Sequence, residues 1–351
     1  MENKKKSKRL RLFDLQRDGK GISKNQADMT PGLKRFFLSY INNFGKIVST
    51  NIIMVLGNFP IIFLIAALSG ATKNSAFLPM SDLFQNVNGL FEASGANSPY
   101  TLSLFALEGL QNQALVPSAW TYVFYGIGAL TIFTFGPINA ATAYILRNLA
   151  SGEPVFVWTD FIYALKRNIK QSLPFGIIDI GICALLLWNI YNNITTGSFL
   201  TSLFFWTNVI IFILYFFMRF YIYVQMVTFK LTVFKIFKNS LIFALLGFKR
   251  NILALLGIIL LVVIEFLLLF SLGGLLMPFA IAAPLAVLFS TFAYMKVYAS
   301  YYKIKEVMID PYYEEHPDER PETYEDEEVI MTDDVTEKER LEEIKKRNNI
   351  E

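Results

Sequence analysis

The sequence contains very little of what most enzymes use for chemistry. It has one histidine, His316, and one cysteine, Cys183. One cysteine excludes an internal disulfide bond. One histidine, next to Pro317 in an acidic stretch, provides no His-based triad or metal cluster, and the chain has no Gly-rich Lys-Ser/Thr phosphate loop. We therefore expect a protein that is not an enzyme and that carries no cofactor or metal.

Charged residues are also scarce, and they are unevenly placed. Only 17% of residues are Asp, Glu, Lys or Arg, against about 25% in soluble domains, whereas 54% are hydrophobic. Residues 1–46 hold 12 basic and 4 acidic residues, and residues 306–351 hold 6 basic and 18 acidic residues. The sequence therefore predicts an all-α polytopic membrane helix bundle at 47–305, between a basic tail and an acidic tail.

Six stretches are long and apolar enough to cross a bilayer, which takes about 20 helical residues. They lie near residues 47–69, 119–146, 172–191, 200–222, 251–271 and 275–298. Before them, residues 33–46 form an amphipathic lead-in suited to the membrane interface. For the long loop 70–118 we expect a loosely ordered segment with one or two helical turns, and a small ligand-contacting cap is the alternative.

Lys and Arg gather in the loops on one side of these spans, and membrane proteins keep such loops in the cytoplasm. We call the loop after the second span, residues 147–171, the first elbow, and the loop after the fourth span, residues 228–250, the second elbow. Both elbows, the N-terminal tail and the exit from the sixth span are basic. The sequence thus predicts a multi-pass protein of the cytoplasmic membrane with both termini cytoplasmic.

Each elbow contains a segment with the apolar spacing of an amphipathic helix. In the first elbow this helix is expected over residues 157–171, with Thr159 as its N-cap. Its apolar face comprises Val157, Trp158, Phe161, Ile162, Leu165 and Ile169, opposite Asp160, Lys166, Arg167, Lys170 and Gln171. In the second elbow the apolar residues Val233, Phe234, Ile236, Phe237 and Leu241 lie away from Lys235, Lys238 and Asn239.

The two elbows also resemble each other in sequence. The first-elbow residues Arg167, Lys170, Gln171, Ser172 and Leu173 match Lys235, Lys238, Asn239, Ser240 and Leu241 in spacing and type. One interpretation is a repeat of membrane helix, basic elbow and membrane helix; the other is a chance likeness of two basic interfacial helices. A true repeat would give two surfaces at headgroup level for lipid or a cytoplasmic partner.

The end of the second span contains residues that alter helices. Pro137 removes a backbone N–H and predicts a kink. Gly136 beside it permits close approach of a neighbouring helix, and Gly152 permits a sharp turn before Glu153. Two interpretations stay open, a structural kink and turn or a hinge that couples the elbow to the span.

Polar residues inside the spans are costly, at about 2.5–3.5 kcal/mol for a charge at a helix centre, and often functional. Asp179 in the third span and Arg219 in the fourth are at depths that suit an ion pair. Glu265 in the fifth span has no obvious basic partner, and Asn58 and Asn208 are its candidate polar neighbours. Asp179 and Glu265 are interpreted either as part of a proton or substrate pathway, or as groups that hold helices together.

The first elbow carries a resemblance to a known family. The residues Gly136, Pro137, Ala140, Tyr144, Gly152, Glu153, Phe156, Asp160, Phe161, Lys166, Arg167, Asn168 and Lys170 resemble the signature elbow of the YesL family of bacterial membrane proteins. The second elbow resembles that family's second elbow through Lys235, Lys238 and Asn239. The family has no known function, and its members are commonly encoded near carbohydrate uptake functions in Gram-positive bacteria. The resemblance therefore implies an auxiliary role in sugar import.

Three functional hypotheses follow. The first is a non-enzymatic accessory protein of a bacterial carbohydrate uptake system that docks a protein partner, such as a transporter subunit, on its elbows. The second is a transporter or permease subunit in its own right, and the third is a membrane sensor or regulator. All three place the protein in the lipid bilayer of a bacterium, and none involves nucleic acid.

Overall fold

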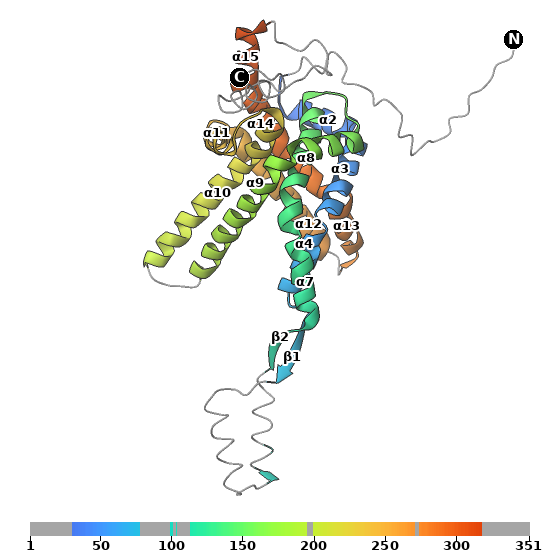
Figure 1. The fold of residues 1–351 in the computed structure, drawn as a ribbon. Coiled ribbons are helices and arrows are strands. Elements are labelled where there is room, and N and C mark those ends of the chain that lie inside the picture. Colours follow the sequence, from blue (N-terminus) through green and yellow to red (C-terminus); the bar gives the residue numbers. More distant parts are fainter. Residues whose placement is uncertain are drawn as a thin grey trace, which may run out of the picture. The chain divides into compact units, whose positions relative to one another are not determined.

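The computed structural model describes residues 30–77, 99–100, 103, 113–194, 199–270 and 274–317. The predictions for the basic tail up to residue 29, for most of the loop 70–118 and for the acidic tail from residue 318 lie outside this described part. Within it the fold is all-α apart from one two-stranded ribbon, as the composition predicted (Figure 1).

The helices follow one another with short connections. In chain order they are α2 (Leu33–Asn42), α3 (Phe44–Gly57), α4 (Pro60–Leu68), α7 (Ala119–Ala129), α8 (Thr131–Ser151), α9 (Val157–Asn193), α10 (Phe199–Thr228), α11 (Val233–Leu246), α12 (Phe248–Phe270), α13 (Met277–Ala283), η2 (Pro284–Leu288), α14 (Phe289–Ile304), η3 (Lys305–Ile309) and α15 (Asp310–Glu315). The segments η2 and η3 are π-helical turns that continue the helices around them.

Five helical stretches in the described residues are long and apolar enough to cross a membrane. They are 119–151, 157–193, 199–228, 248–270 and 277–315, and a sixth counts if α3 and α4 are taken as one span. The break between α3 and α4 was not predicted. It falls at Asn58 and Phe59, just before Pro60, which occupies the first turn of α4 and cannot donate the backbone hydrogen bond that would continue α3. Long apolar helices of this kind indicate a membrane-embedded protein.

The chain divides into two compact units, one of residues 57–135 and one of the remaining chain on both sides of it. In the smaller unit, α4 packs along α7, and Phe63 meets Phe124 edge to face at 5.2 Å. The strands β1 (Lys73–Phe77) and β2 (Gln113–Pro117) pair antiparallel, with Lys73 opposite Pro117. The loop prediction did not include this ribbon, whereas residues 99–100 and 103 of the same loop are helical, as expected.

A small hydrogen-bonded cluster joins the ribbon to α7. Ser118 is the N-cap of α7, and its hydroxyl accepts from Thr121 N while the Thr121 hydroxyl accepts from Ser118 N. The same Thr121 hydroxyl donates to the carbonyl of Thr72 at 2.8 Å. This capping box satisfies N–H groups that a helix start otherwise leaves unpaired.

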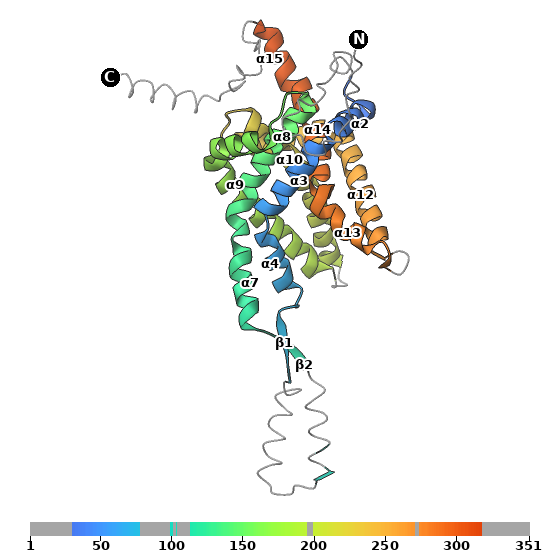
Figure 2. The same cartoon turned by 90° about the vertical axis from the view of Figure 1, so that its right-hand side faces the viewer.

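In the larger unit, α9 and α10 run side by side, and α12 lies beside α13 and α14 (Figures 1 and 2). Its core is built on aromatic side chains with almost no exposure, among them Tyr221 and Phe220 of α10, Phe175 of α9 and Tyr294 of α14. The ends of α8 and α14 meet where the Tyr302 hydroxyl donates to the carbonyl of Ala150 at 2.7 Å. We call this end of the larger unit, which also contains both elbows, the elbow end.

Asn51 fixes the π-helical turn η2. Its amide donates to the carbonyls of Pro284 and Leu285 at 2.8 and 2.9 Å, and its carbonyl oxygen accepts from Ser290 N at 2.8 Å. Asn51 is fully buried. Because Pro284 and the wider π turn leave backbone groups without their usual helical partners, this one side chain replaces the missing hydrogen bonds.

Candidate functional site

The first elbow begins at a glycine-capped helix end. Gly152 has a φ of 98°, a left-handed conformation that glycine adopts without strain. The backbone N–H groups of Gly152 and Glu153 both donate to the carbonyl of Asn148, at 3.0 and 2.9 Å. This arrangement ends α8 and turns the chain sharply, as the sequence predicted for Gly152.

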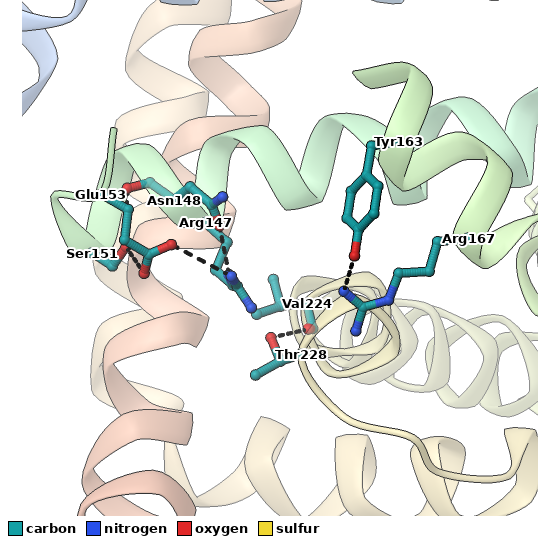
Figure 3. Close-up of polar contacts among 8 residues, drawn as sticks. All are labelled: Arg147, Asn148, Ser151, Glu153, Tyr163, Arg167, Val224 and Thr228. Carbon is teal, nitrogen blue, oxygen red and sulfur yellow. Dashed lines mark hydrogen bonds and ion pairs between the residues drawn. The ribbon is translucent and has the colours of Figure 1, made fainter. Parts of the chain in front are cut away.

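The turn is held from inside by a buried ion pair. The Arg147 guanidinium lies 3.6 Å from the Glu153 carboxylate, and Arg147 Nε donates to Asn148 Oδ1 at 2.9 Å (Figure 3). The Ser151 hydroxyl donates to the other Glu153 oxygen, and the guanidinium lies over the Tyr144 ring at 5.2 Å. The family-like residues Tyr144 and Glu153 thus share Arg147, which in the sequence is one of the basic residues of the first elbow.

Helix α9 starts at Val157, as predicted, but Thr159 is not its N-cap. Phe156 takes that position, and its backbone N–H donates to Asp160 Oδ2 at 2.8 Å. The expected separation into an elbow helix and a third span was also wrong, because α9 is continuous from Val157 to Asn193. Pro174 lies inside this helix and does not end it.

The elbow part of α9 buries a stripe at helical spacing. Phe161, Ala164, Asn168 and Ser172 are buried, and the Asn168 amide donates to the carbonyl of Ala164 at 2.9 Å. Trp158 and Ile169, which the sequence assigned to the same apolar face, are instead 67% and 43% exposed. They sit on a neighbouring side of the helix, an apolar edge suited to lipid.

A second exposed side of the elbow part of α9, away from Trp158 and Ile169, carries basic residues. It consists of Tyr163, Lys166, Arg167 and Lys170, all exposed, and we call it the basic edge. The Arg167 guanidinium donates to the Tyr163 hydroxyl at 3.2 Å (Figure 3). Tyr163 packs on Tyr144 with ring centroids 5.9 Å apart. The basic edge is therefore linked through two tyrosine rings to the Arg147 pair, while Phe156 is exposed beside its start.

Below the elbow, α8 and α9 cross at two glycines. A Cβ atom on Gly136 would lie 2.0 Å from the Ser172 carbonyl oxygen and 2.8 Å from Gly176 Cα. The predicted close approach at Gly136 is therefore confirmed, and its neighbour across the crossing is Gly176. Ala140, one turn further along α8, is also buried. The helix is continuous through Pro137, and its break from α7 falls earlier, at Leu130.

Asp179 and Arg219 come together, with two tyrosines that were not predicted. Arg219 Nε lies 2.9 Å from Asp179 Oδ1, and Asp179 is fully buried. Tyr215 donates to Asp179 Oδ1 at 2.8 Å and Tyr223 donates to Oδ2 at 2.9 Å. The sequence does contain the signal, since positions 215, 219 and 223 recur every four residues and so share one face of α10.

A second cation lies near this cluster. The ammonium group of Lys296, on α14, interacts electrostatically with both Arg219 and Asp179. In the sequence, Lys296 belongs to the basic exit from the predicted sixth span. Three helices, α9, α10 and α14, therefore contribute to the surroundings of one carboxylate, and α14 packs against α10.

The second elbow buries the positions that correspond to those of the first. Ile236, Ser240 and Phe243 are buried on α11, as Asn168, Ser172 and Phe175 are on α9. Both phenylalanines pack on tyrosines of α10, Phe175 on Tyr223 and Phe243 on Tyr221, with ring centroids 5.7 and 5.6 Å apart. This agreement favours the repeat interpretation over chance. Lys238 is exposed, and Lys235 and Asn239 are half-buried.

Contacts join the two elbows and the end of α14. The Gln171 amide of the first elbow donates to the carbonyl of Leu231, just before α11. Arg250, at the start of α12, lies 3.2 Å from Glu306, which also accepts from Lys303 at 3.0 Å. The hydrogen bond from Lys303 lowers the pKa of Glu306, which lies beyond the predicted sixth span.

Other predicted polar positions do not join the cluster. Glu265 is half-buried on α12 and forms no hydrogen bond or ion pair with the residues that the structure describes. Asn208, its candidate neighbour, donates to the carbonyl of Phe204 in its own helix. Asn58 lies in the break between α3 and α4. His316 is exposed and stacks on Tyr312 with ring centroids 4.7 Å apart.

The comparison with protein families places a similarity over this same region. A family described as "Protein of unknown function, DUF624" matches residues 116–190, which include α7, α8, the first elbow and most of α9. No curated protein and no solved structure matches the chain. The chain is thus a membrane-type helix bundle whose first elbow is similar to a family of unknown function.

Proposed function

We propose that the protein is a non-enzymatic integral membrane protein that docks a partner protein on the basic edge of its first elbow. In this proposal it is an accessory component of a carbohydrate uptake system in a bacterial cytoplasmic membrane, with both termini in the cytoplasm. The observation that carries the proposal is the exposure of Tyr163, Lys166, Arg167 and Lys170 on a rigidly held helix. The link to sugar uptake comes from the resemblance to the YesL family, whose members are commonly encoded near carbohydrate uptake functions.

The way the elbow is supported favours docking over a passive connection. A partner gains affinity from a surface that does not have to be ordered on binding. The basic edge meets this condition, because α9 continues without interruption into its apolar part, while the Arg147–Glu153 pair and the Gly152 turn hold its start. The apolar edge at Trp158 and Ile169 suits the lipid interface, where tryptophan is enriched, and leaves the basic edge for a partner with acidic groups.

The test is purification of the tagged full-length protein from its native membranes in mild detergent, with quantification of co-eluting sugar transporter subunits. We expect the triple variant Lys166→Glu, Arg167→Glu, Lys170→Glu to insert normally and to lose most of the transporter subunit. Its matched control is Lys230→Glu, Lys238→Glu, Lys249→Glu, which reverses three exposed charges of the same end. Equal loss in both variants, or no loss in either, would contradict docking on the basic edge.

A transporter in its own right is the alternative, and Glu265 favours it. A half-buried carboxylate in an apolar helix without an ion pair in the described residues is where an ion or proton pathway is expected. Asp179 is a poorer candidate, because four side chains already hold it. Substrate-dependent uptake by the purified protein alone in liposomes, abolished by Glu265→Gln, would establish this alternative and overturn the accessory role.

A further inference from the structure

The second elbow contains cations and no carboxylate. Residues 228–250 hold five lysine and arginine residues and neither Asp nor Glu. Three of these cations, Lys230, Lys238 and Lys249, are exposed and have no hydrogen bond or ion pair among the residues that the structure describes. The first elbow differs, because its own sequence supplies two carboxylates. The second elbow therefore presents three charges that are available to an anionic group from outside the chain.

One of these lysines lies in an exposed apolar side of α11. Five exposed residues fall within an arc of about 100° around the helix, and we call them the outer face: Phe234, Lys238, Leu241, Ile242 and Leu245. The sequence assigned Phe234 and Leu241 to the same face as Ile236, which is instead buried. Helix α11 is therefore apolar on two sides, and the exposed one contains a lysine. An exposed apolar side of this size marks a contact with protein or membrane.

The other side of α11 is held against an apolar span. Phe237 packs on Tyr215 with ring centroids 6.3 Å apart, and the Gln225 amide donates to the Ser240 hydroxyl at 3.1 Å. Tyr215 precedes the end of α10 at Thr228 by about 20 Å of helix, so α11 folds back along the last turns of α10. Helix α12, also long and apolar enough to span, starts one residue after α11 ends. Joined to two such helices, α11 lies where headgroups meet acyl chains.

We propose that the outer face of α11, with Lys230 and Lys249 at its two ends, binds the phosphate headgroups of anionic lipids. The apolar side chains of an interfacial helix bury among acyl chains, while lysines among them extend their ammonium groups to headgroup level. Lysine serves there as a point-charge ligand for phosphate. Lys238 is the only polar side chain of the outer face, so this face lacks the further hydrogen-bonding groups that orient a protein partner. Lipid therefore suits it better than protein.

The experiment measures retention of phosphatidylglycerol by the purified full-length protein in native mass spectrometry, with zwitterionic phosphatidylcholine as the comparison. We expect selective retention of phosphatidylglycerol, weakened about tenfold or more in the triple variant Lys230→Gln, Lys238→Gln, Lys249→Gln. If this variant does not fold, Lys238→Gln alone replaces it, and about fivefold weaker retention is expected. The corresponding triple variant with Arg at all three positions keeps the charges and must keep the lipid.

The matched control removes as many exposed cations from the basic edge of the first elbow. It is Lys166→Gln, Arg167→Gln, Lys170→Gln. We expect this control to keep most of its phosphatidylglycerol, because on α9 the basic edge and the apolar edge are different sides of the helix. Equal losses in the two Gln triple variants would reduce the effect to net charge and overturn the proposal. Unchanged retention in the second-elbow variant, or loss in a folded Arg variant, would overturn it as well.

A photoreactive residue at Ile242, on the outer face, separates lipid from protein in native membranes. We expect crosslinks from this position to lipid. Capture of one protein instead, lost when Lys230, Lys238 and Lys249 are changed to Gln, would assign the outer face to a protein partner and overturn the proposal. The same triple variant should still retain the transporter subunit through the basic edge. Lipid binding by the second elbow and docking on the first therefore fail or stand separately.

Discussion

The two elbows have the same buried pattern and different mechanics. On α9 and α11 the buried residues recur at matching positions, and each helix packs a phenylalanine on a tyrosine of α10. The first elbow then continues directly into its apolar helix, whereas the second ends at Gly247 and α12 starts anew at Phe248. The same buried pattern therefore occurs in one elbow that is part of a continuous helix and in another that ends before the next helix starts.

The difference lies in what fills the space against α8 and α10. In the first elbow two glycine backbones touch at Gly136 and Gly176, so the helix passes straight through the contact. In the second, a Cβ on Gly247 would meet the Tyr221 hydroxyl at 1.9 Å, and Tyr221 in turn donates to Asn251 of α12 at 2.8 Å. The Tyr221 side chain of α10 thus lies against the break between α11 and α12, whereas in the first elbow backbone atoms of α8 and α9 are in contact.

The largest expected effect comes from the glycine crossing. Gly136→Ala places a methyl group against backbone atoms of α9, which cannot rotate away, and we expect a loss of about 4 kcal/mol in unfolding free energy or failure to fold. Gly247→Ala meets the end of a side chain and should cost about half as much. Gly181→Ala on α9, with open space around it, should be neutral. Unfolding midpoints in detergent measure all three, and equal effects at Gly136 and Gly181 would refute the crossing.

The next effect compares two polar contacts of α10, one with α9 and one with α12. Asp179→Asn leaves the Arg219 charge without its carboxylate, and we expect a loss of about 3 kcal/mol, as for other buried pairs with one member removed. Tyr221→Phe removes one neutral hydrogen bond to Asn251 and should cost about 1–2 kcal/mol. Chemical denaturation of the purified variants gives both values. A smaller loss for Asp179→Asn than for Tyr221→Phe would show that the ion pair does not hold α9 to α10.

The smallest stability effect is the difference between the ion pairs of the two elbows. Arg147 and Glu153 have side-chain exposures of 8% and 11%, so we expect Glu153→Gln to cost about 1–2 kcal/mol. Arg250 and Glu306 are 35% and 52% exposed, and solvent screening limits the cost of Glu306→Gln to below about 1 kcal/mol. Thermal unfolding in matched detergent compares the pair. The reverse order would mean that the first elbow is not held by Glu153.

Much of the fold could be predicted from sequence because apolar runs of membrane length have few other uses. The six expected spans correspond to the apolar helices, and the roles of Gly136 and Gly152 followed from glycine chemistry. The break at Asn58 and the continuity of α9 were missed, because Pro60 ends one helix whereas Pro174 lies inside another without ending it. The ribbon was missed because its two strands are far apart in the sequence.

The candidate site was harder to predict than the helices. Asp179 and Arg219 stood out because each is a charge in an apolar span. Tyr215 and Tyr223 did not, because tyrosine is common in this chain, with 17 in total, and only their spacing around Arg219 distinguishes them. Asn51 and Lys296 act on residues far along the chain, and such pairings depend on helix packing that no local pattern contains.

Site-specific photo-crosslinking in native membranes tests the docking surface most directly. A photoreactive residue placed at Tyr163, on the basic edge, is compared with the same residue at Phe234, an exposed aromatic position of the second elbow. The account predicts a crosslink from position 163 to a sugar transporter subunit that is absent from position 234 and is lost when Lys166, Arg167 and Lys170 are changed to Glu. Crosslinks from position 163 to lipid alone, or the same protein captured from both positions, would contradict it.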